Sequence, residues 1–68
     1  MNAKTASTDF RNPTNDNGAV IRWNDMHVIF GQWIGSEFVP SYHKPSRSYK
    51  TEAGARKAAE AWTNAERP

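Results

Sequence analysis

The sequence predicts a small α+β fold, in which a three-stranded antiparallel sheet packs against one C-terminal helix. Residues 19–23 and 26–30 are two apolar, β-branched runs separated by an Asn-Asp pair, a pattern typical of a β-hairpin. Residues 55–65 repeat alanine, with one tryptophan, at the spacing of a single helical face. With 68 residues, the chain is long enough for one domain only.

The hairpin pattern also predicts a register. A two-residue primed turn at residues 24–25 would place the two runs in antiparallel pairing. The opposite face of the pair would then present Arg22 and His27 together with Val20 and Ile29. The side chains expected on the core face are Ala19, Ile21, Trp23, Met26, Val28 and Phe30.

Residues 31–50 contain breaks and one further strand. Gly31 and Gly35 indicate a bulge or a turn between the second and third strands. Residues 37–42 are expected to form the third strand, and Pro40 makes it an edge strand because proline has no donor for a ladder bond. Residues 47–49 are predicted to be a short extended lead into the helix.

The helix is expected to begin after Thr51, which is a good N-cap residue. Glu52 in the first turn suits the positive end of the helix dipole. The small side chains of the apolar face require that the helix lie close to the sheet, with Trp62 as its anchor. The alanines on this face are Ala55, Ala58, Ala59 and Ala65.

Residues 1–17 are predicted to be a disordered or mobile N-terminal arm. They are rich in Asn, Thr, Ser and Asp, and Phe10 is their one sizeable apolar side chain. The single small α+β domain is accordingly expected to span residues 18–66.

Composition argues for a binding protein rather than an enzyme. The chain has no cysteine, and His27 and His43 are its only histidines, so we expect no metal site, no cofactor and no catalytic residues. No apolar run approaches the roughly 20 residues of a membrane-spanning helix, and no signal peptide is visible. We therefore expect a cytoplasmic protein that does not bind membranes.

Charge indicates where a nucleic acid would bind. The formal net charge is only +2, but residues 42–50 contain three basic side chains and no acidic one. Together with the two basic residues on the open sheet face, they would form a surface that contacts phosphates. The alternative is that residues 42–50 are an ordinary solvated loop. The predicted contacts to double-stranded DNA are Arg22, His27, Lys44, Arg47 and Lys50.

Residues 49–62, with an aromatic residue, the Thr51 cap and the alanine-rich helix, resemble the end of AP2-type DNA-binding domains and of the arm-binding domains of phage integrases. The resemblance implies a three-stranded sheet packed on a helix, with the open sheet face reading the major groove. It implies DNA contacts at Arg22, His27, Arg47 and Lys50, and a small accessory or regulatory protein of the phage or mobile-element type.

Two alternatives to DNA binding remain open. An inhibitor or adaptor could occupy a host protein through an exposed surface formed by Trp33, Ile34 and Phe38. Self-association into a homodimer is the other alternative, because an open sheet face or edge in so small a domain invites pairing.

Overall fold

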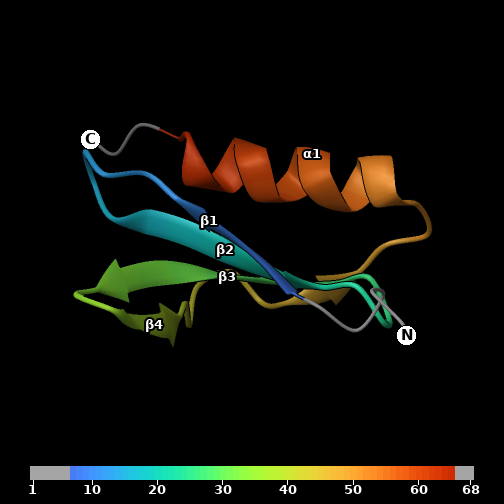
Figure 1. Cartoon of the computed structure of the whole chain (residues 1–68), viewed down its shortest axis with the longest axis horizontal. Helices are drawn as coiled ribbons and strands as arrows, with labels where there is room; N and C mark the ends of the chain where they lie inside the picture. Colours follow the sequence, from blue (N-terminus) through green and yellow to red (C-terminus); the bar gives the residue numbers. More distant parts are fainter. Residues whose placement is uncertain (1–6, 66–68) are drawn as a thin grey trace.

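The computed structural model describes residues 7–65, which form one antiparallel sheet with a helix on one side (Figure 1). The α+β class with a C-terminal helix is confirmed, but the sheet has five strands instead of three. In chain order the elements are β1 (Ser7–Arg11), β2 (Asn17–Arg22), β3 (His27–Ile34), β4 (Glu37–Pro40), β5 (Arg47–Ser48) and α1 (Glu52–Thr63).

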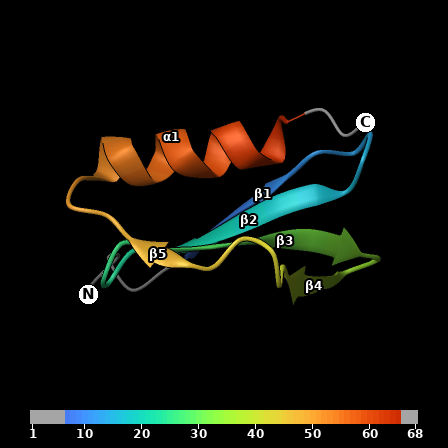
Figure 2. The ribbon, with the colours of Figure 1, turned by 180° about the vertical axis from the view of Figure 1, so that it is seen from behind.

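Strands β1 to β4 follow one another across the sheet, and β5 also pairs with β3. The short strand β5 pairs with the start of β3, whereas β4 pairs with its end, so the two share one edge of β3 (Figure 2). In the described part of the chain, no helix is long and apolar enough to cross a membrane.

The predicted register of the first hairpin is confirmed, because Ile21 lies opposite Val28 and Ala19 opposite Phe30. The turn itself differs from the prediction. Strand pairing stops at the Arg22–His27 pair, so the loop has four residues, 23–26, instead of two. A primed turn would need a positive φ at residue 24. In the structure the residue of this loop with a positive φ is Met26, at 50°. The register survives because both loops bring the same residues opposite one another.

Strand β3 continues through Gly31, where the sequence indicated a break. The turn comes instead at Gly35, whose φ is +65°, and a positive φ at the first central residue is typical of a two-residue type II′ hairpin. The following strand β4 ends at Pro40 and pairs only with β3, so the prediction of an edge strand is confirmed.

The predicted mobile arm is wrong for residues 7–17. Residues 7–11 form strand β1, which pairs with β2 along its whole length. Two indole N–H groups from elsewhere in the chain hold this strand: Trp23 Nε1 donates to Thr8 Oγ1 over 2.8 Å and Trp33 Nε1 donates to the Phe10 carbonyl over 3.0 Å. The expected domain boundary at residue 18 therefore falls inside β2. Residues 1–6 of the predicted arm lie outside the described residues.

The core lies between the sheet and α1. Ala55 and Ala59 are fully buried against the sheet, which confirms that the alanine face allows a close approach. Trp62 anchors the helix because its Nε1 donates to the Gly31 carbonyl over 3.0 Å and its ring meets Phe30 edge to face. The predicted cap is also confirmed: Thr51 Oγ1 accepts the Gly54 amide over 3.0 Å.

The loop between β1 and β2 caps the other end of α1. The last carbonyls of a helix have no partner within the helix. Three asparagine side chains donate to carbonyls at this end. Asn12 donates to the Thr63 carbonyl over 3.0 Å and Asn17 to the Trp62 carbonyl over 3.3 Å. Asn15 donates to the Ala65 carbonyl, just beyond the helix, over 3.1 Å. The asparagine-rich stretch that resembled a mobile arm is thus a capping loop, and it places β1 and β2 relative to the helix.

Candidate nucleic-acid interface

The sheet face opposite α1 carries a row of four polar side chains that crosses four strands. Ser7 of β1 lies opposite Arg22 of β2, which lies opposite His27 of β3, which lies opposite Ser48 of β5. Opposed residues of a sheet point to the same face, and neighbours along a strand point to opposite faces. Ile21 and Val28, the neighbours of Arg22 and His27, are buried in the core beneath the helix. The four polar side chains therefore lie on the face away from the helix. We call these four residues the polar row.

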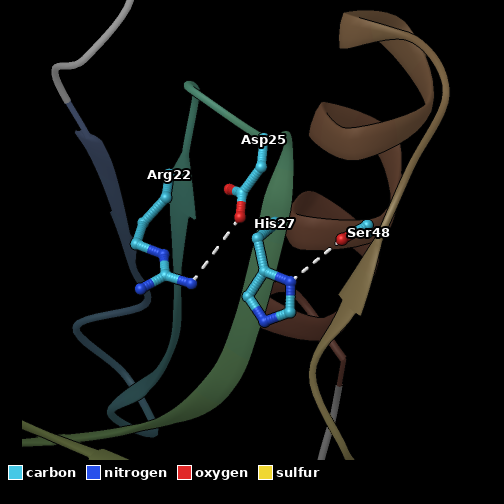
Figure 3. Close-up of polar contacts among 4 residues, drawn as sticks. All are labelled: Arg22, Asp25, His27 and Ser48. Carbon is cyan, nitrogen blue, oxygen red and sulfur yellow. Dashed lines mark hydrogen bonds and ion pairs between the residues drawn. The ribbon is translucent and has the colours of Figure 1, made fainter.

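Arg22 and His27 are neighbours at the centre of this row. Figure 3 shows their side chains next to each other on adjacent strands, with Asp25 above them in the loop. His27 Nδ1 lies 3.1 Å from Ser48 Oγ, so the hydroxyl holds one nitrogen of the ring and leaves the other, Nε2, for a ligand. Arg22 Nη2 lies 3.9 Å from Asp25 Oδ2.

The Arg22–Asp25 ion pair is weak. Its separation is long, and both side chains are about half exposed, at 53% and 54%. Water screens such pairs, and they typically contribute about 0–1 kcal/mol. Asp25 therefore lowers the local positive charge but does not immobilise the guanidinium, which stays free to reach a ligand.

Beyond the polar row, the open face is apolar on β2 and β3, with the exposed Asp9 of β1 opposite Val20, and it then becomes aromatic. Val20 and Ile29 lie opposite each other and are half-buried. At the far end, the Trp33 ring covers Gly18, where a side chain would overlap it. The Arg11 guanidinium carbon lies 5.4 Å from the centre of that ring. The basic groups on this face thus stand at its two ends.

The structure brings together only part of the predicted basic surface. Arg22 and His27 share the open face, as the alternation along the hairpin predicted. Lys44 does not join them, because its Nζ lies 5.1 Å above the ring of Phe30 in the helix-covered core. Arg47 lies opposite Val28, on the helix side, with its guanidinium carbon 5.7 Å from the ring of Tyr49.

Lys50 is exposed in the segment between β5 and α1. Sequence reasoning missed four other polar side chains of the open face. Ser7, Asp9 and Arg11 belong to a strand that was not predicted. Ser48 belongs to a segment interpreted only as a lead into the helix. The alternation of residues along 7–11 was the available signal, but one large apolar side chain is too few to show it.

The aromatic surface of the alternative hypothesis is also divided. Trp33 and Phe38 lie opposite each other on the open face, with ring centres 5.1 Å apart, and both are half-buried. Ile34 follows Trp33 and points to the other side of the sheet, where it is 65% exposed. The expectation of an exposed Trp33 is therefore wrong, since its ring packs on Gly18.

Among residues 7–65, no three His, Cys, Asp or Glu side chains gather in a way that could hold a metal ion.

Comparisons of the chain with protein-family models, with curated proteins and with solved structures found no match. The resemblance to AP2-type and integrase arm-binding domains therefore stays a prediction.

Proposed function

We propose that this chain is a small DNA-binding protein, of the accessory or regulatory kind found in phages and mobile elements, and that it binds through the open face of its sheet. The observation that supports the proposal is the polar row. Four side chains able to donate hydrogen bonds lie side by side across four strands, on a face that no other element of the described chain covers.

The two central residues are suited to different contacts. Arg22 presents a planar fork of donors, which suits bidentate contact with guanine or with a phosphate. His27 offers one ring nitrogen outward while Ser48 holds the other. Ser7 and Ser48, at the ends of the row, are suited to phosphate oxygens, since small hydroxyl groups often make such contacts.

The location of the row favours duplex DNA as the ligand. Arg22 and His27 flank the four-residue loop between β2 and β3, so they stand at one end of the sheet. A two-stranded ribbon fits the major groove, which is about 12 Å wide. Inserting this end of the hairpin would bring both side chains to the base edges, while the serines on the flanking strands stay near the backbone.

Binding to a random DNA duplex, measured by fluorescence anisotropy at several salt concentrations, tests the proposal. If two or three phosphates are neutralised, affinity should fall roughly 10- to 40-fold between 50 and 200 mM salt. The same titration against an uncharged polymer is the control. No binding of the duplex at low salt would overturn the proposal.

Binding to a host protein is the second candidate function, and a different surface favours it. Three large apolar side chains are exposed in and after the β3–β4 hairpin: Ile34 at 65%, Val39 at 40% and Tyr42 at 83%. Ile34→Ser should then abolish capture of a partner from lysate, whereas Arg22→Gln should not. Nuclease treatment of the lysate separates this outcome from capture through nucleic acid.

A further inference from the structure

The outer edge of β1 carries free backbone hydrogen-bonding groups. The amide of Asn12 donates to the Asn17 carbonyl over 2.8 Å, so these two residues are a hydrogen-bonded pair. Backbone groups alternate in direction along an antiparallel strand. Thr8 and Phe10 therefore bond to β2, while the N–H and C=O groups of Ser7, Asp9 and Arg11 point away from the sheet.

The opposite edge of the sheet is protected differently. Ile34 and Glu37 flank the two-residue turn and bond to each other, so Phe38 and Pro40 are the residues of β4 whose backbone groups point outward. Proline has no N–H, and proline on an edge strand is a common protection against pairing with another chain. Strand β1 contains no proline, which makes it the better edge for pairing.

We propose that β1 pairs antiparallel with β1 of a second copy of this chain, about a two-fold axis at Phe10. In this register, each Asp9 lies opposite the Arg11 of the other copy, and the outward backbone groups of both residues are satisfied. Of the axes at Asp9, Phe10 and Arg11, only the one at Phe10 places opposite charges opposite each other. An axis at Asp9 would place two carboxylates opposite each other, and an axis at Arg11 would do the same with two guanidinium groups.

The side chains concerned are accessible for such pairing. Asp9 and Arg11 are both exposed and lie on the same face of β1, since they are two residues apart. Among residues 7–65, Asp9 forms no ion pair within its own chain. Its carboxylate is therefore available to a second copy.

The helices leave room for this dimer. Helix α1 packs mainly on β2 and β3, with less contact to β1. In the paired sheet, the two β2 strands are three strand spacings apart, or about 14 Å, whereas a helix with its side chains is about 10 Å wide. Both helices therefore fit side by side on one face, and the two polar rows lie on the other.

Charge reversal tests the register without reference to DNA. Sedimentation equilibrium from micromolar to millimolar protein should show a weak monomer–dimer equilibrium for the unchanged chain, because an edge contact of three β1 residues from each copy is small. Asp9→Arg and Arg11→Asp should each weaken association about tenfold or more, since both facing pairs become repulsive. Circular dichroism of each variant checks that it still folds.

An equimolar mixture of the two single variants gives the decisive result. One copy then carries arginine at both positions and the other carries aspartate at both, so every facing pair is again opposite in sign. We expect the mixture to dimerise at least as well as the unchanged chain, although neither variant does so alone.

Amide hydrogen exchange provides a second measurement, on the unchanged chain. The amides of Asp9 and Arg11 should gain protection as protein concentration rises, while those of Thr8 and Phe10 are protected throughout. A monomer at millimolar concentration, or a mixture of variants that stays monomeric, would overturn the proposal. Neither outcome bears on the DNA-binding proposal, because no measurement here includes DNA.

Discussion

The indole N–H of Trp33 donates to the carbonyl oxygen of Phe10 over 3.0 Å and thereby ties β3 to β1 across the strand between them. The ring reaches that far because it lies over Gly18 of β2, where no side chain is in its way. One tryptophan thus connects three strands on the face away from the helix, and it helps to define the strand that carries Ser7, Asp9 and Arg11.

Replacing this indole should loosen β1. Trp33→Phe keeps an aromatic ring but removes the donor to the Phe10 carbonyl, so the free energy of unfolding should fall by about 1–2 kcal/mol. Chemical denaturation measures the loss, and amide exchange at Thr8 and Phe10 should accelerate more than exchange within α1. Tyr42→Phe, a substitution at an 83% exposed ring, is the control and should change nothing.

Adding a methyl group beneath the ring should be costly as well. A Cβ at Gly18 would overlap the Trp33 ring and lie 2.6 Å from the Phe10 carbonyl oxygen. Gly18→Ala should therefore lower the free energy of unfolding by about 1–3 kcal/mol. In a Trp33→Ala background the cost should shrink without vanishing, because the backbone contact remains. Equal costs in both backgrounds would show that the ring does not cover Gly18.

The asparagine cap predicts a difference between two substitutions at one position. Asn12 donates through Nδ2 to the Thr63 carbonyl and accepts the Thr14 amide through Oδ1. Asn12→Ala removes both contacts, at a cost of about 1 kcal/mol. Asn12→Asp keeps the acceptor but places a negative charge at the negative end of α1, so it should cost at least as much. An aspartate variant as stable as the unchanged protein would contradict the assignment of this loop as a cap.

The sequence was sufficient for those parts of the fold that depend on local signals. Alternation along residues 19–30 predicted the register of β2 and β3 and the face of Arg22, and the Thr51 cap predicted where α1 begins. Strand β1 could not be predicted, because Trp23 and Trp33 hold it through contacts 15 and 23 residues away in the chain. Such contacts do not require apolar alternation, and with Phe10 as its one large apolar side chain the strand shows too little of it to be recognised.

The same reason explains why the predicted site was only partly right. Strand alternation determines the sheet face on which the Arg22 and His27 side chains lie. Lys44 lies in a loop, where no such alternation determines which way a side chain points. Its ammonium group lies over Phe30, on the helix-covered side of the sheet. Arg47 lies on that side because β5 pairs with β3 in a register that no turn signal specified.

Asp25 should weaken DNA binding, since it places a carboxylate 3.9 Å from the guanidinium of Arg22. Asp25→Asn removes that charge and frees the arginine, so affinity for duplex DNA should rise about two- to fivefold at low salt. Stability should change by less than about 1 kcal/mol, because the ion pair is exposed. A gel-shift titration beside a thermal melt measures both, and reduced affinity would count against Arg22 as a DNA contact.

Binding through the open face is tested by comparing two cations on opposite sides of the molecule. Arg22 belongs to the polar row, whereas Lys57 is exposed on α1, and Arg22→Gln and Lys57→Gln change the net charge equally. Fluorescence anisotropy with duplex DNA at low salt should show a loss of about five- to tenfold for Arg22→Gln and less than about twofold for Lys57→Gln. Equal losses for the two variants would contradict binding through the open face of the sheet.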